Sequence, residues 1–214
     1  MATSRLKSIQ ERDKHLRELK SLDSKALQDS LKELKPEEAD FFGKCGIFCR
    51  ACFVFLKTIQ KPGKEMRDAL MAVNMDDAVE LVYPREAYDT FRKVLDYFCD
   101  EFTCVGGCDA CYSLQEEGTY KQCPMRVCCA EKGIHTCGEC KEFEDTFLKG
   151  GTCHVPFMEL IAKRYSNWTI DNLTKVNKLG YKETFESIMS DVDQGLTSLD
   201  VISSESVFKP APKK

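Results

Sequence analysis

Twelve of the thirteen cysteines in the chain fall into short clusters. The first two clusters share the spacing Cys-x3-Cys-x2-Cys and begin at Cys45 and Cys104. Cysteines two or three residues apart allow the thiolates of one tight turn to converge on a single ion, which is how tetrahedral zinc and iron–sulfur sites are built. The sequence therefore predicts a metal-binding protein, and it indicates no particular reaction.

These two clusters supply three ligands each, whereas a closed tetrahedral zinc site takes four. Later cysteines can provide the remaining donors, and the pairs 108/111 and 137/140 have the two-residue spacing of a zinc ribbon. We therefore expect about two closed structural zinc sites. The candidate metal ligands are Cys45, Cys49, Cys52, Cys104, Cys108, Cys111, Cys123, Cys129, Cys137 and Cys140.

An iron–sulfur protein that carries electrons or assists a redox enzyme is the main alternative, because three clustered thiolates and a distant one also hold a [4Fe-4S] cluster. We favour zinc, since the later Cys-x2-Cys pairs suit separate sites and no ferredoxin-type continuous run is present. Radical S-adenosylmethionine enzymes share the Cys-x3-Cys-x2-Cys pattern, but they need a large α/β barrel for which this helical pattern leaves no room. Thiol redox work by Cys137 and Cys140 would need a thioredoxin-like context that is missing.

Five residues near the clusters have roles that the spacing leaves open. Cys99 lies beside an apolar helical stripe, which favours a buried, inert thiol. The adjacent Cys128 and Cys129 are too cramped for both to bind one ion comfortably, so we expect one of them to be free. A histidine near a cysteine run is more often a supporting or surface residue than a ligand. The residues left open are Cys99, Cys128, Cys153, His135 and His154.

No catalytic constellation accompanies the cysteines. The sequence has no Gly-rich phosphate loop, no nucleophile elbow and no His-Glu-x2-His motif. We therefore assign no catalytic residue, and we interpret the chain as an interaction or accessory module sooner than as an enzyme.

Acidic residues outnumber basic ones, 35 against 31, which gives a net charge of −4. No basic excess is then available to neutralise a phosphate backbone, so we expect no nucleic-acid partner and leave a protein partner open. The N-terminus lacks the apolar run of a signal peptide, and no stretch approaches the roughly 20 apolar residues of a membrane span. We expect a cytoplasmic protein without membrane contact, whose reducing surroundings keep the thiols available for metal.

Helical periodicity dominates the remaining sequence, which predicts a mainly α protein with cysteine-rich metal-binding loops. We expect an N-terminal amphipathic helical segment over 1–40, a cysteine-rich helical domain over 41–190 and a mobile tail over 191–214. Core candidates before Pro84 include Met66, Leu70, Met71, Val79 and Leu81. The expected helices cover 5–34 with a break near 23–24, then 52–59, 64–82, 85–102, 125–132, 139–148, 156–165, 170–179 and 185–189.

The order of these cysteines resembles a cysteine-rich family called domain of unknown function 3795. Its members show Cys-Gly-x2-Cys-x2-Cys, then Gly-Cys, then a stretch with Cys, Arg, Cys-Ala and Lys-Gly, and finally Cys-x2-Cys with an aromatic residue. The resemblance covers residues 43–148, with a weaker likeness at 172–180. The matching positions are Cys45, Gly46, Cys49, Cys52, Gly107, Cys108, Cys123, Arg126, Cys129, Ala130, Lys132, Gly133, Cys137, Cys140 and Phe143.

This resemblance implies metal binding and supplies no assigned reaction. The chain departs from the pattern after Phe143, where the family shows Pro-Cys and this sequence has Glu144 and Asp145. One ligand of the family's set is then absent, and Cys153 or Asp145 is the candidate to replace it.

Overall fold

The computed structural model describes residues 4–81, 83–101, 104 and 123–202. Within these residues every regular element is a helix, so the prediction of a mainly α fold is confirmed. None of the helices in the described ranges has both the length and the apolar character needed to span a bilayer. The chain divides into two compact units, one formed by Met1–Cys52 with Gly106–Lys214 and the other by Phe53–Val105.

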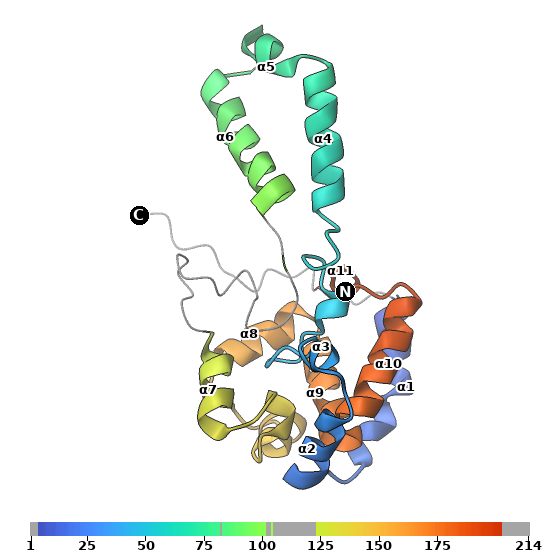
Figure 1. The fold of residues 1–214 in the computed structure, drawn as a ribbon. Helices are drawn as coiled ribbons and strands as arrows, with labels where there is room; N and C mark the ends of the chain where they lie inside the picture. The colour runs from blue at the N-terminus through green and yellow to red at the C-terminus, as the bar shows by residue number, and fades with distance from the viewer. Residues whose placement is uncertain (1–3, 82, 102–103, 105–122, 203–214) are drawn as a thin grey trace. The chain divides into compact units, whose positions relative to one another are not determined.

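The first unit holds the N-terminal and C-terminal helices together with most of the described cysteines (Figure 1). Its N-terminal elements are α1 (Ser4–Arg12), the 3-10 turn η1 (Lys14–Glu18), α2 (Ser24–Lys32), α3 (Pro36–Ala39) and the 3-10 turn η2 (Cys49–Ala51). Its later elements are α7 (Pro124–Lys132), the 3-10 turn η6 (Cys137–Glu139), the π turn η7 (Glu144–Leu148), α8 (Phe157–Arg164), α9 (Trp168–Leu179), α10 (Tyr181–Asp193) and α11 (Ser198–Val201).

Helix α9 is the centre of this unit. Ten of its twelve residues are buried, and it contacts α1, η1, η6, α8 and α10 (Figure 1). A helix that is covered on every side must satisfy its polar side chains inside the protein. The surroundings of α9 therefore have to supply partners for two lysines and two asparagines.

Two apolar clusters pack around α9. One joins the N-terminal helices to α10 and α11, with Leu6 and Leu27 against Tyr181, Ile188 and Val201. The other packs against the later cysteines and consists of Cys45, Met125, Phe143, Val155, Met158, Ala162, Ile170 and Leu173. The first cluster builds the scaffold, and the second supports the cysteine-bearing turns.

Several predicted boundaries in this unit agree with the structure. Asp23 caps α2 by accepting a hydrogen bond from Ala26 N at 2.8 Å, which explains the break between the N-terminal helices. The helices expected at 125–132, 156–165 and 170–179 are present as α7, α8 and α9.

Two later predictions need correction. The helix expected at 139–148 is interrupted, because the chain forms the turn η6 and then the π turn η7. The short helix expected at 185–189 is the middle of the 13-residue α10. Buried Tyr181 extends the apolar face of α10 toward its N-terminus, beyond the predicted segment, which itself contains the buried Ile188.

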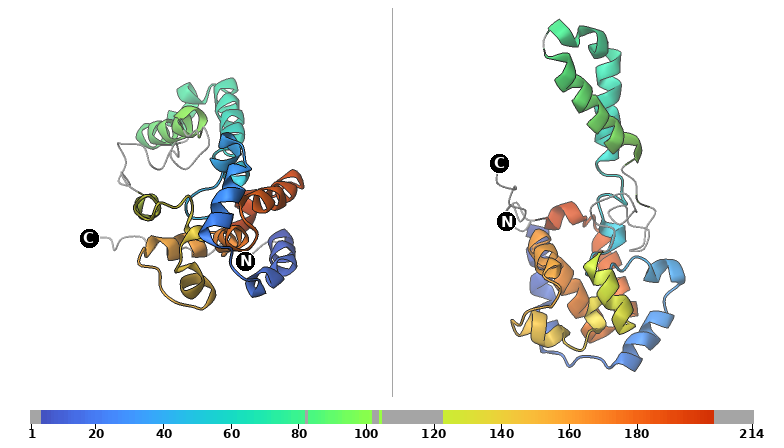
Figure 2. Two further views of the ribbon diagram at one scale, coloured as in Figure 1. Left: turned by 60° about the horizontal axis from the view of Figure 1, so that its bottom comes forward. Right: turned by 90° about the vertical axis from the view of Figure 1, so that its left-hand side faces the viewer.

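The second unit is a helical hairpin (Figure 2). Its partners α4 (Gln60–Ala72) and α6 (Arg85–Asp96) are joined by α5 (Met75–Ala78) and η3 (Val79–Leu81), and the π turn η4 (Tyr97–Glu101) follows α6. Arg67 of α4 pairs with Asp96 at 3.4 Å and with Asp100. Cys99 is 1% exposed and lies against Gly63 of α4, which confirms that it is buried.

Two expectations for the hairpin are wrong. Residues 52–59 form turns instead of a buried helix, and Pro62 lies in the first turn of α4, where a missing N–H costs nothing. Met66, Met71 and Leu81 are exposed, whereas Val79 is buried as predicted. Helical spacing predicted the helices of the hairpin, but it did not predict which side of each helix is buried.

A buried ion cluster connects α9 to the N-terminal residues. The Lys175 side chain is only 2% exposed, and its ammonium lies 2.7 Å from Asp13 and 4.0 Å from Asp191. Arg12 pairs with Asp191 at 2.9 Å. Burial alone would raise the pKa of Asp13, but hydrogen bonds from Arg12 and Lys175 hold that pKa below its ordinary value. The ionised carboxylate of Asp13 therefore stabilises the folded state.

We predict that Asp13→Asn lowers the free energy of unfolding by about 1–3 kcal/mol at pH 7, because it leaves the Lys175 ammonium underpaired. The pKa of Asp13 is lower in the folded than in the unfolded state. Its contribution to the free energy of unfolding is therefore present above the unfolded pKa of about 3.9 and is lost as the pH falls through the folded pKa. Urea unfolding as a function of pH measures both effects. Asp29→Asn, which removes an exposed pair with Lys32, should cost less than about 0.5 kcal/mol. Equal losses for the two variants would contradict the assignment.

Candidate metal centre

Two cysteine turns are held by asparagine side chains of α9. The Asn172 amide donates to the carbonyl of Gly46 at 2.9 Å, and the Asn177 amide donates to the carbonyl of Gly138 at 3.0 Å. Each glycine directly follows a cysteine, Cys45 or Cys137. The two buried amides thus fix the backbone next to two candidate ligands.

The same glycines allow a very close approach to the helix backbone. A Cβ atom on Gly46 would lie 2.1 Å from the carbonyl oxygen of Thr169, and one on Gly138 would lie 2.8 Å from that of Leu173. Gly46 also has φ +87°, in the left-handed region that disfavours other residues. The glycine after each cysteine is therefore required for contact with α9.

Further hydrogen bonds tie the second turn to the first and to α10. The Cys137 amide donates to the carbonyl of Lys44 at 2.9 Å. The buried Glu139 carboxylate accepts from the Tyr181 hydroxyl at 2.6 Å and from the His135 amide at 2.7 Å. Burial and the charge of Glu139 raise the pKa of Tyr181 well above its ordinary value, so the hydroxyl stays a donor. These hydrogen bonds hold the turn in place without a bound ion.

An inner pair of thiols lies where the two turns meet α7. The Sγ atoms of Cys129 and Cys137 are 3.8 Å apart, and Cys129 is fully buried. Their hydrogen bond lowers the pKa of Cys129 and, together with burial, raises the pKa of Cys137. The charge of Cys45 acts on Cys137 in the same direction. The two thiols therefore interact directly, and a cation between them could replace their hydrogen bond.

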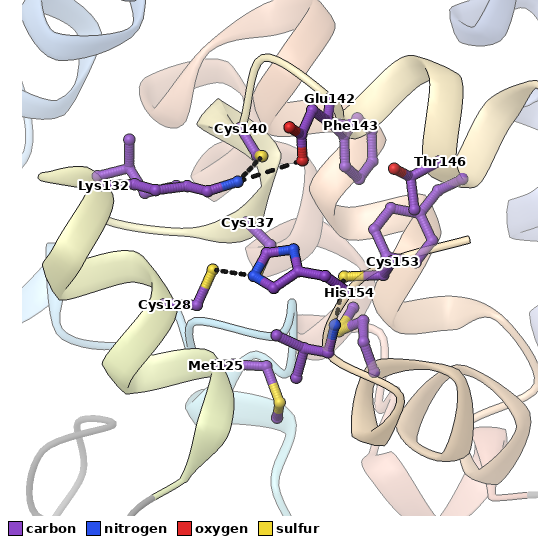
Figure 3. Close-up of a pocket in the computed structure, with 14 residues that line it drawn as sticks. Met125, Cys128, Lys132, Cys137, Cys140, Glu142, Phe143, Thr146, Cys153 and His154 are labelled. Atoms are coloured by element: carbon purple, nitrogen blue, oxygen red, sulfur yellow. Dashed lines mark hydrogen bonds and ion pairs between the residues drawn. The ribbon is translucent and has the colours of Figure 1, made fainter. Parts of the chain in front are cut away.

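A second group of polar side chains lines a hollow of about 20 Å³ next to the inner pair (Figure 3). Cys128 Sγ lies 3.4 Å from His154 Nε2, and Lys132 Nζ lies 3.2 Å from Cys140 Sγ. Cys153 and Cys137 also border this hollow. Spacing alone did not single out the contact between Cys128 and His154. Its only sequence signal is the dipeptide Cys-His after a glycine pair.

The predicted ligands are therefore dispersed over several places. The structure brings Cys129 and Cys137 into contact, and Cys45 is near enough to Cys137 to affect its pKa, whereas Cys140 faces Lys132. Cys49 is buried at the start of η2, Cys52 follows η2, and Cys123 caps α7. Cys104 belongs to the second unit, and Cys108 and Cys111 lie outside the described residues. Across the part of the chain that the structure describes, no three His, Cys, Asp or Glu donors already surround a common point.

His135 has a structural environment. Its Nε2 atom lies 3.1 Å from the carbonyl oxygen of Ala39, and its ring packs edge-on against Tyr181 with centroids 5.5 Å apart. Burial lowers the pKa of His135, which favours the neutral ring. These contacts direct His135 to the scaffold, whereas His154 faces a thiol.

Comparison with known proteins agrees with this arrangement of cysteines. Residues 41–149 match the sequence pattern of DUF3795, a family of proteins of unknown function. The chain belongs to this family. No curated protein and no solved structure gives a match. The family match ends before α9, so the helix that holds both cysteine turns lies outside it.

We predict that Gly46→Ala lowers the free energy of unfolding by roughly 2–5 kcal/mol, through strain at positive φ and overpacking against α9. Gly150→Ala is the matched control, because Gly150 has φ +82° and a Cβ there would meet nothing within 4 Å. The control should cost only about 1–2 kcal/mol. Thermal unfolding followed by circular dichroism compares the two variants, and equal shifts would contradict the close contact with Thr169.

Proposed function

We propose that the chain is a metal-binding protein whose inner thiols, Cys129 and Cys137 with Cys45, bind a zinc ion as part of the fold. The supporting observation is the separation of 3.8 Å between the Sγ atoms of Cys129 and Cys137. Two thiolates on one tetrahedral zinc, with Zn–S near 2.3 Å, are separated by about 3.8 Å. The pair therefore has the spacing that one ion requires.

The surroundings of the inner pair also suit a cation. The apolar cluster of Met125, Phe143 and Met158 excludes water beside the thiols. Lys44 is close enough to lower the pKa of Cys129, and its positive charge would offset the excess negative charge of several thiolates. Zinc would contribute folding free energy here, because two of its three ligands, Cys45 and Cys137, lie in a turn and in the short 3-10 segment η6.

An iron–sulfur cluster remains the alternative occupant. In a cubane cluster each thiolate binds its own iron, so two thiolates in contact suit a single ion better. A reducing compartment would keep the thiols available for a metal ion. We accordingly propose a cytoplasmic accessory or interaction module that binds a protein partner and carries out no reaction of its own.

We predict that protein purified without oxygen contains zinc, and that Cys129→Ala binds one equivalent less than the unmodified chain. Cys99→Ala is the control, because Cys99 is an equally buried thiol in the second unit. Elemental analysis by mass spectrometry measures the metal content. A brown protein that contains iron and sulfide would select the alternative, and an unchanged zinc content in Cys129→Ala would exclude the inner centre.

We also predict that a strong chelator increases hydrogen exchange in residues 123–153 while α4 and α6 remain protected. The two helices form a hairpin with its own packing and ion pairs, whereas the cysteine turns depend on the bound ion. Hydrogen exchange with mass spectrometry resolves the two regions. Uniform protection with and without chelator would contradict a structural ion.

A further inference from the structure

The two adjacent cysteines of α7 face different groups. Consecutive residues of a helix point about 100° apart, so the side chains of Cys128 and Cys129 leave α7 in different directions. Instead, Cys128 Sγ lies 3.4 Å from His154 Nε2 across the hollow (Figure 3). The cramped spacing that led us to expect one free cysteine thus places the two thiols in separate environments.

The hollow contains a complete set of donors for a soft cation. Cys140, Cys153 and His154 line it together with Cys128, and its space of about 20 Å³ has room for one small ion. Three cysteines and one histidine form one of the common ligand sets of structural zinc. None of these thiols is required by the contact between Cys129 and Cys137.

The observed contact between Cys128 and His154 fits the proportions of a zinc site. With Zn–S near 2.3 Å and Zn–N near 2.0–2.1 Å, a sulfur and a nitrogen on one tetrahedral ion are separated by about 3.6 Å. The measured separation is 3.4 Å. His154 is exposed, so its ring can adjust to an incoming ion without disturbing the core.

Charge also favours occupation of the hollow. Three thiolates and a neutral imidazole around Zn²⁺ carry one net negative charge, which the Lys132 ammonium, 3.2 Å from Cys140 Sγ, can balance.

We propose that Cys128, Cys140, Cys153 and His154 form a second zinc site, separate from the inner pair of Cys129 and Cys137. Cys128 and His154 provide the preformed edge, and Cys140 and Cys153 close on the ion when it binds. Each thiol that binds releases its proton to solvent, so zinc replaces protons without any change of oxidation state. Lys132 keeps its hydrogen bond to the Cys140 sulfur.

The same contact could instead belong to a nucleophilic cysteine, with His154 as the base that activates Cys128. The two ideas differ in an observable way, because zinc protects the thiol from alkylation and a nucleophile reacts with iodoacetamide rapidly. Fast alkylation of Cys128 in the zinc-loaded full chain would overturn the second zinc site.

The full chain, reconstituted with Zn²⁺ under reducing conditions, provides the main test. Cys128→Ser and His154→Ala should each bind one zinc fewer than the unmodified chain, and combining His154→Ala with Cys129→Ala should remove two. His15→Ala is the matched control, since His15 is exposed and is not one of the residues that line the hollow. Unchanged zinc content in both Cys128→Ser and His154→Ala would overturn the proposal.

A conservative variant distinguishes the loss of a ligand from misfolding of the chain. His154→Cys turns the ligand set into four cysteines, so it should retain the ion and shift the visible bands of the Co²⁺-substituted protein. Retention of the ion with an unshifted spectrum would count against His154 as a ligand. Zinc loss in His154→Ala but not in Cys129→Ala would leave this site standing and remove the inner centre.

Discussion

The contact of two cysteine turns with α9 is the constraint on which the rest of the site depends. Gly46 and Gly138 bring backbone against backbone, and Asn172 and Asn177 satisfy the carbonyls that this approach buries. A side chain at either glycine would separate the turn from the helix. The cysteines on these two turns are therefore positioned by α9, a helix that itself contains no cysteine.

The central position of α9 in turn depends on the ends of the chain. Lys175 is paired with Asp13, and Lys178 is paired with Glu144 beside Ser21. Without these partners, the buried ammonium groups would oppose the packing of the helix. The N-terminal helices thus form part of the same core as the cysteine turns, and ion pairs connect the two regions.

Much of the helical framework could be predicted from the sequence, because apolar spacing, capping residues such as Asp23 and helix ends such as Gly133 act locally. The cysteine clusters identified the candidate ligands for the same reason. The burial of α9 could not be predicted, since its lysines and asparagines have the pattern of an exposed face until their partners are known. The contact between Cys128 and His154 was equally hidden, because 26 residues separate two side chains that only the fold brings together.

The family match and the packing of α9 have different limits along the chain, and this difference has a practical consequence. A fragment cut at residues 41 and 149 would retain the recurring cysteine pattern but lose Asn172, Asn177 and Tyr181. Such a fragment would carry thiols on turns with nothing to lie against. The cysteine pattern of residues 41–149 therefore does not by itself supply the contacts that hold its turns in this chain.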